Sequence, residues 1–133
     1  MVEFSKAEER FLRRNELGRL ATVSRDGMPH VVPVCYLYHA GDLLIAIDYE
    51  TKKYRNLKAD DRAAFVVDVY KPTIRGILVQ GKAKILERGP VFQEAYGLFH
   101  RKFSWVRRDP WKEGEAPFVR LKPSKKTSWN LAQ

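Results

Sequence analysis

The residues best suited to chemistry lie at the start of an expected helix, in the stretch 49–57 (YETKKYRNL). Thr51 has the properties of an N-cap, and Lys52 and Lys53 follow it directly. Cations at this end of a helix are unfavourable by roughly a few tenths of a kcal/mol, because the backbone there is already partly positive. A bound phosphate would reverse the effect, since it would accept hydrogen bonds from the free N–H groups, the hydroxyl and both ammonium groups. The stretch therefore predicts an anion site, with Arg55 adding positive charge; two ordinary exposed lysines are the alternative.

Few other residues of the sequence offer chemistry. His30, His39 and His100 are far apart and have no Cys, Asp or Glu at metal-ligand spacing, so no metal site is expected. There is no G-x-S-x-G, Walker or G-x-G-x-x-G motif and no serine with an evident base. Cys35 lies in an apolar strand pattern and is expected to be a small core residue. Such a chain either binds a partner or leaves the difficult chemistry to a cofactor.

The composition is that of one ordinary globular domain, with 133 residues of which 44% are hydrophobic. Its net charge of +9, from 25 Lys and Arg against 16 Asp and Glu, favours anionic partners such as nucleic acid or phosphorylated small molecules. No apolar run is long enough to span a membrane, and residues 1–14 are too charged for a signal peptide. A single cysteine excludes an internal disulfide. These features predict a cytoplasmic protein.

Capping and turn signals divide the chain into short elements. Ser5 and Glu8 have capping-box spacing, and Asp26-Gly27 is a hairpin signal. We expect strands over 18–24, 29–39, 43–48, 62–70, 76–86, 116–123 and 125–131, helices over 5–16, 51–60 and 90–105, and a charged loop over 106–115. This order predicts a single mainly β domain, a small barrel of six to seven antiparallel strands with helical insertions.

Two residues predict irregularities in these strands. Pro33 has no N–H to donate, so the strand over 29–39 is expected to be an edge there, to bulge, or to face something other than a strand. Gly81 marks a bend or bulge in the strand over 76–86.

Short motifs occur in an order that resembles a known family. They are LATV, the Asp-Gly hairpin, PHVVPV, the GDL turn, the cationic turn TKK, RNL, the D-x-R-A-A strand, GILVQGKAKIL, and the closing Pro123 and Trp129. In this order they resemble the FMN-binding split β-barrel family, that of pyridoxamine 5′-phosphate oxidase, over nearly the whole chain. The resemblance implies a Greek-key-like split barrel that forms a homodimer, with the cofactor sites between the two chains.

The resemblance also implies a role for particular residues. Beside the isoalloxazine ring it places the backbone of His30, Val31, Val32, Pro33 and Val34. Along the ribityl chain it places Ile47 and Asp48, and around the phosphate it places Thr51, Lys52 and Lys53. Trp129 would approach the cofactor of the second subunit; a core or dimer-interface aromatic is the alternative.

Two departures from the family bear on the activity. Lys52-Lys53 stands where pyridoxamine 5′-phosphate oxidase usually has Arg then Lys. That enzyme also continues beyond its tryptophan into an R-x-H segment that binds pyridoxal phosphate, whereas this sequence has four residues after Trp129. We therefore expect negligible oxidation of pyridoxamine 5′-phosphate.

The sequence thus predicts a homodimeric FMN-dependent oxidoreductase of unknown substrate, in which no side chain is a catalytic acid or base. The substrate is expected under the segment 100–111, where Phe103, Trp105 and Trp111 are available for stacking. Two alternatives stay open: an F420-dependent reductase on the same fold, and a non-enzymatic basic module that binds nucleic acid.

Overall fold

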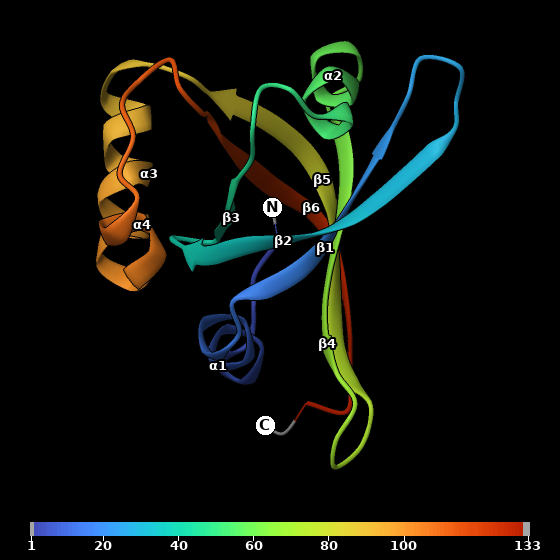
Figure 1. Ribbon diagram of the computed structural model, residues 1–133. Coiled ribbons are helices and arrows are strands. Elements are labelled where there is room, and N and C mark those ends of the chain that lie inside the picture. Colours follow the sequence, from blue (N-terminus) through green and yellow to red (C-terminus); the bar gives the residue numbers. More distant parts are fainter. Residues whose placement is uncertain (1, 132–133) are drawn as a thin grey trace.

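The computed structural model describes residues 2–131 as a β-barrel with four helices around it (Figure 1). The helices are α1 (Lys6–Arg14), α2 (Lys52–Ala59), α3 (Gly89–Lys102) and α4 (Ser104–Arg108). The strands are β1 (Leu17–Val23), β2 (Pro29–His39), β3 (Asp42–Ala46), β4 (Arg62–Val69), β5 (Arg75–Leu86) and β6 (Phe118–Trp129). Over this described range, no helix has the length and apolar character needed to cross a bilayer.

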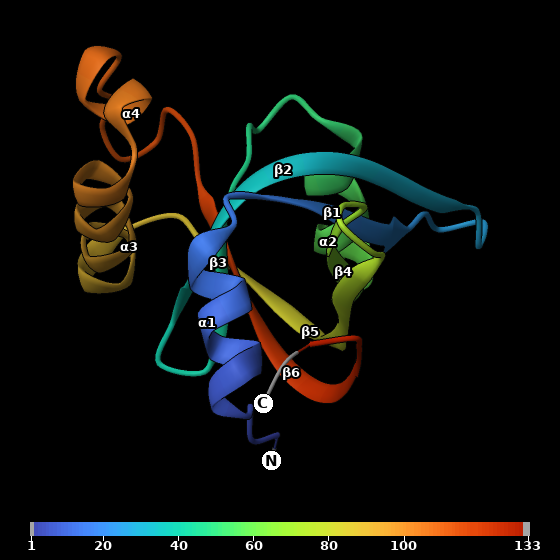
Figure 2. The same ribbon diagram turned by 90° about the horizontal axis from the view of Figure 1, so that it is seen from below.

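The barrel closes in the order β1-β2-β3-β6-β5-β4, with every pair antiparallel. One apolar core fills its interior, from Leu20 and Tyr36 to Phe65 and Val119. A second core joins the outer face of β2, β3 and β6 to α3 and α4, around Phe99 and Phe118. The helices α1 and α2 lie at opposite ends of the barrel, and α3 with α4 forms a separate flank in both views (Figures 1 and 2). The predicted mainly β, six-stranded antiparallel barrel is confirmed.

Most boundaries differ from the prediction by one or two residues, and the largest differences lie after residue 86. The strands expected over 116–123 and 125–131 are one strand, β6, with Ser124 as an extra residue, since Gln80 pairs with Lys125 but Gly81 pairs with Pro123. The irregularity predicted at Gly81 is confirmed, with the extra residue on β6 rather than on β5, but the seventh strand was wrong. The helix expected over 90–105 ends at Lys102, and α4 occupies the beginning of the expected loop, because the chain becomes extended at the buried residue Phe103.

A buried carboxylate fixes α1 to the barrel. Glu8 closes the predicted capping box, as its side chain accepts from the Ser5 N–H at 2.8 Å and the Ser5 hydroxyl accepts from the Glu8 N–H. It also accepts hydrogen bonds from Lys126 and, at 2.6 Å, from Ser128, both on β6. Burial alone would raise the pKa of Glu8, but the hydrogen bonds from Lys126, Ser128 and Ser5 and the charge of Lys126 outweigh it and lower the pKa.

Replacing this carboxylate should weaken the fold in a pH-dependent way. We expect Glu8→Gln to lower the free energy of unfolding at pH 7 by roughly 1–3 kcal/mol, because the half-buried Lys126 ammonium loses its charged acceptor. The wild-type advantage is complete above the unfolded pKa of 4.5 and is lost as the pH falls through the lower folded value. Urea denaturation at several pH values measures both effects. The exposed Glu3→Gln is the control, and an equal deficit in both variants would contradict the assignment.

Candidate functional site

The strand β2 has a partner on only one side along its first seven residues. Residues 29–35 pair with β1, whereas pairing with β3 begins at Tyr36, opposite Ile45. The Tyr36 N–H donates to the Glu16 carbonyl oxygen at 3.0 Å, so alternation along the strand turns the backbone groups of Val31 and Pro33 away from β1. Among the described residues, an N–H at position 33 would therefore have no strand partner. This agrees with the predicted alternative that the strand is an edge at Pro33.

A pocket of about 570 Å³ opens where β2 and β3 separate. One wall consists of residues 33–35 of β2, Ala46 at the end of β3, the two residues 47–48 that follow it, and Lys53 of α2. Five predicted cofactor residues lie together here: Pro33, Val34, Ile47, Asp48 and Lys53. Cys35, expected in the core, is half-buried: it packs against the second core and also lines this wall. Burial together with the nearby Glu16 carboxylate raises the pKa of its thiol.

The other lining residues come from α4 and from the chain between α4 and β6. Its lining residues are Trp105, Asp109, Pro110, Trp111, Glu115 and Ala116. The rings of Trp105 and Trp111 are stacked, with centroids 5.9 Å apart and planes 7° apart. Trp111 is fixed by two hydrogen bonds: its indole N–H donates to the Ala116 carbonyl oxygen, and its backbone N–H donates to the Tyr96 hydroxyl oxygen. The two tryptophans predicted for stacking thus face the predicted cofactor residues, whereas Phe103 is buried in the second core.

The start of α2 lies at the edge of this pocket. The Thr51 hydroxyl accepts the Tyr54 N–H at 3.4 Å and donates to the Asp48 carbonyl oxygen at 2.7 Å, which confirms Thr51 as the N-cap. In the described part of the chain, neither Lys52 nor Lys53 has an acidic partner within ion-pair distance. Both ammonium groups are therefore free to bind an anion at the helix start.

The two lysines face different hollows. Lys53 lines the pocket between β2 and β3, while Lys52 lines a second hollow of about 590 Å³ with Arg25, Arg55 and Lys58. This second hollow, which we call the basic groove, lies between α2 and the turn that joins β1 to β2. Sequence reasoning did not foresee the groove, because Arg25 is distant in sequence from α2.

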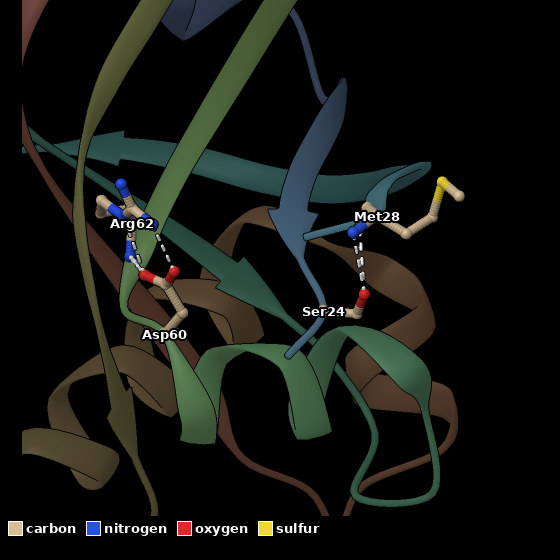
Figure 3. A network of polar contacts seen from close by, with 4 residues as sticks. All are labelled: Ser24, Met28, Asp60 and Arg62. Atoms are coloured by element: carbon tan, nitrogen blue, oxygen red, sulfur yellow. Dashed lines mark hydrogen bonds and ion pairs between the residues drawn. The ribbon is translucent and has the colours of Figure 1, made fainter. Parts of the chain in front are cut away.

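Short polar contacts hold the β1–β2 turn and the chain that follows α2 (Figure 3). In the β1–β2 turn, the Ser24 hydroxyl accepts the Met28 N–H at 3.1 Å. At the other end of α2, Asp60 accepts three hydrogen bonds from Arg62, one of them at 2.7 Å from the guanidinium. The Arg62 side chain, followed by its backbone N–H, lowers the pKa of Asp60 to about 2. Asp60 is therefore paired with Arg62 and does not form an ion pair with the lysines at the start of α2.

The other predicted residues lie outside the pocket. His30, Val31 and Val32 continue along β2, and the buried Nδ1 atom of His30 has no hydrogen-bond partner within the described residues. Trp129 ends β6 opposite Gly76, where a Cβ atom would come within 2.6 Å of the indole ring. This end of β6 lies far from α2 (Figure 1). Trp129 does not join the pocket of its own chain, so its predicted role requires a second chain.

The chemistry of these groups fits a flat cofactor that carries a phosphate. Free cations at a helix start suit the phosphate, unpaired backbone groups on β2 suit the polar edge of a ring, and the stacked tryptophans suit a planar face. The described residues hold no cluster of three or more His, Cys, Asp or Glu side chains that would suit a metal ion.

Comparisons with known proteins agree with this geometry. The family model described as pyridoxamine 5′-phosphate oxidase matches residues 4–130. A 5a,11a-dehydrotetracycline/5a,11a-dehydrooxytetracycline reductase from Streptomyces rimosus is 35% identical over 96 residues, which cover 66% of this chain and 68% of that protein.

Two solved structures share the fold at lower identity. The haem storage protein HutZ from Vibrio cholerae superimposes with a TM-score of 0.80 at 15% identity, over 90% of this chain and 89% of that one. An F420 reductase superimposes with a TM-score of 0.72 at 24% identity, over 93% of this chain and 98% of that one. Because the family model spans almost the entire sequence, the chain belongs to the pyridoxamine 5′-phosphate oxidase family.

Proposed function

We propose that the protein is a reductase that binds FMN between β2, β3 and the start of α2. The observation that carries the proposal is the position of the free cations Lys52 and Lys53 beside a pocket that opens along the unpaired edge of β2. Similarity to a protein named as a reductase supports the reaction class. When bound, the cofactor supplies hydride transfer, which none of the lining side chains could supply.

The residues of the chain would bind and orient the cofactor, and they would exclude water from it. Thr51, Lys52 and Lys53 would hold the phosphate at the helix start, where the N–H groups also point toward it. The backbone of Val31 and Pro33 would meet the polar edge of the ring. The stacked pair Trp105 and Trp111 would close the opposite side and keep water away from the reacting atoms.

F420 is the second candidate cofactor, and the basic groove favours it. F420 has the same kind of tricyclic ring and a phosphate, and it carries acidic glutamate residues beyond that phosphate. Four basic side chains line the groove next to Lys53, whereas Asp26 is the acidic residue on its lining. FMN ends at its phosphate and would leave Arg25 and Arg55 without a role.

We also propose that the active form is a homodimer. Val31 is 62% exposed on the unpaired part of β2, and Tyr70 and Ile74 at the β4–β5 turn are 72% and 54% exposed. Large apolar side chains in such positions are typical of surfaces that another chain covers. A second chain would also bring Trp129 to the cofactor pocket of its partner, as the family resemblance implies.

The phosphate site can be tested by removing the two lysines. We expect Lys52→Ala/Lys53→Ala to weaken FMN binding by at least about tenfold, because each charge-assisted hydrogen bond contributes roughly 1.5–3 kcal/mol. Flavin fluorescence quenching and the visible spectrum measure the affinity. Lys84→Ala/Lys122→Ala is the matched control, since it removes two exposed lysines from β5 and β6 and changes the net charge equally. Equal losses in both variants would place the phosphate elsewhere.

The choice between the cofactors can be tested in the basic groove. We expect Arg25→Gln/Arg55→Gln to weaken F420 by about tenfold and FMN by less than about twofold, because only F420 extends past the phosphate. Equilibrium dialysis with each cofactor measures this difference. If wild-type protein binds neither cofactor and instead shifts RNA at physiological salt, the proposed function is wrong and the basic-module alternative holds.

The dimer can be tested by light scattering. We expect a mass of two chains at micromolar concentration, and we expect Val31→Asp to shift the protein to the monomer with reduced cofactor affinity. Met28→Asp, in the exposed β1–β2 turn, is the control for the added charge. A wild-type monomer that retains full cofactor affinity would contradict the proposal.

A further inference from the structure

A buried polar pair joins α2 to the barrel. Among the described residues, the buried polar or charged side chains are Glu8, which fixes α1, and the pair Thr22 and Asn56, which are 1% and 4% exposed. The Asn56 amide donates to the Thr22 hydroxyl oxygen at 3.0 Å. Asn56 is the middle residue of the RNL motif, and Thr22 lies on β1. The hydrogen bond therefore connects two segments that lie far apart along the chain.

Such a pair is a poor choice if stability alone is its purpose. Asparagine is a weak helix former, and an apolar pair of similar shape would fill the same space without desolvating an amide and a hydroxyl. Leu57, the next residue of α2, already anchors the helix in the core of the barrel. Apolar contacts have no preferred direction, whereas a hydrogen bond holds its two groups at a defined distance and angle. In coiled coils a single buried asparagine fixes the register of the helices. The pair is thus suited to orient α2.

The hydrogen bond also connects the two halves of the proposed cofactor site. Asn56 follows Lys52 and Lys53 by four and three residues, so the three side chains occupy neighbouring positions on the helix surface. Thr22 lies opposite His30, the first of the β2 residues expected beside the ring. One buried bond therefore relates the helix that carries the phosphate site to the strands that carry the ring site.

The other side-chain contacts of α2 with the barrel are longer. The Tyr54 hydroxyl lies 3.4 Å from one Glu87 carboxylate oxygen, and the Lys58 ammonium lies 4.0 Å from the other. The Lys58 side chain is largely exposed, so solvent screens this ion pair. Among the polar side-chain contacts of α2 described here, the bond from Asn56 to Thr22 is both the shortest and the most buried.

From these observations we infer that Asn56 and Thr22 are positioning residues for the cofactor phosphate, because their hydrogen bond sets the orientation in which the start of α2 meets the pocket. This inference rests on the proposed function, since it takes the helix start as the phosphate site. Asn56 borders the basic groove but is almost fully buried, so it acts through the orientation of the helix rather than by contact with the phosphate. Loss of the bond should weaken a cofactor only through its phosphate.

The test measures stability and affinity separately. We expect the urea midpoint to fall in Thr22→Val and in Asn56→Leu, because each leaves a buried polar group unpaired, and to recover largely in Thr22→Val/Asn56→Leu. We expect the double variant still to bind FMN at least about tenfold more weakly than wild type, the loss of one charge-assisted contact. Riboflavin, which is FMN without its phosphate, should bind as it does to wild type. Fluorescence quenching measures both flavins, and for F420 the matched ligand is its deazaflavin without the phosphate chain.

Two further variants separate orientation from stability. Glu8→Gln weakens the attachment of α1, at the opposite end of the barrel from α2, and should lower the urea midpoint without changing the ratio of FMN to riboflavin affinity. Thr22→Ser keeps the hydroxyl and should retain the FMN affinity that Thr22→Val loses. The comparison of serine with valine at position 22 carries the test if the variants of Asn56 do not fold.

Each outcome decides for or against the positioning role. Recovery of FMN affinity together with stability in the double variant would show that the pair only holds the fold, and it would overturn the inference. Equal losses of FMN and riboflavin would also overturn it, because the effect would not pass through the phosphate.

Failure of the proposed function is recognised separately. If wild-type protein binds neither FMN nor F420, that function is wrong, and pyrophosphate is then titrated against the amide NMR signals of Lys52 and Lys53. A pyrophosphate affinity that falls in Thr22→Val but not in Thr22→Ser would support the positioning of the helix start by itself. No binding of pyrophosphate, or equal affinity in both variants, would overturn the inference as well.

Discussion

The structure depends on one constraint, which is that β2 and β3 pair only from Tyr36 and Ile45 toward their connecting turn. That turn is tight, because Ala40 and Gly41 both have positive φ, at 51° and 85°, and such a turn matches the twist of the two strands. Beyond Ile45, β3 continues to pair with β6 but leaves β2. Backbone groups of β2 then need partners that the strands of its own chain do not provide. The pocket, the open edge and the start of α2 all occur at this separation.

The distribution of charge gives the two sides of the site different roles. Basic side chains gather around α2 in the basic groove, whereas the side of the pocket with the two tryptophans carries carboxylates. A phosphate would therefore be attracted to the start of α2 rather than to the side that carries Trp105 and Trp111. The net charge of the chain does not reveal this arrangement, because the local fields differ in sign over a short distance.

Much of the fold and part of the site could be predicted from the sequence because the signals are local. Capping at Ser5 and Thr51, the bulge at Gly81 and the interruption at Pro33 each depend on a few neighbouring residues. The ordered motifs that resemble the family also predicted that the strands assemble into a barrel.

The rest depends on contacts between distant segments. The chain turns at Phe103 because that side chain enters the second core, and only this turn brings Trp105 and Trp111 to the pocket. Cys35 packs against the second core as expected but also lines the pocket, because an apolar strand pattern does not show where a neighbouring strand departs. The basic groove requires Arg25 from the β1–β2 turn, which no spacing along the chain connects to α2.

The account is tested most directly by hydrogen exchange at two adjacent amides of β2. Alternation turns the Val31 N–H toward the open edge and the Val32 N–H toward β1. The account predicts that adding the cofactor slows exchange of the Val31 amide strongly, while the Val32 amide is protected before and after. Cofactor binding that leaves exchange at Val31 unchanged would show that the ring does not lie along this edge, and it would contradict the account.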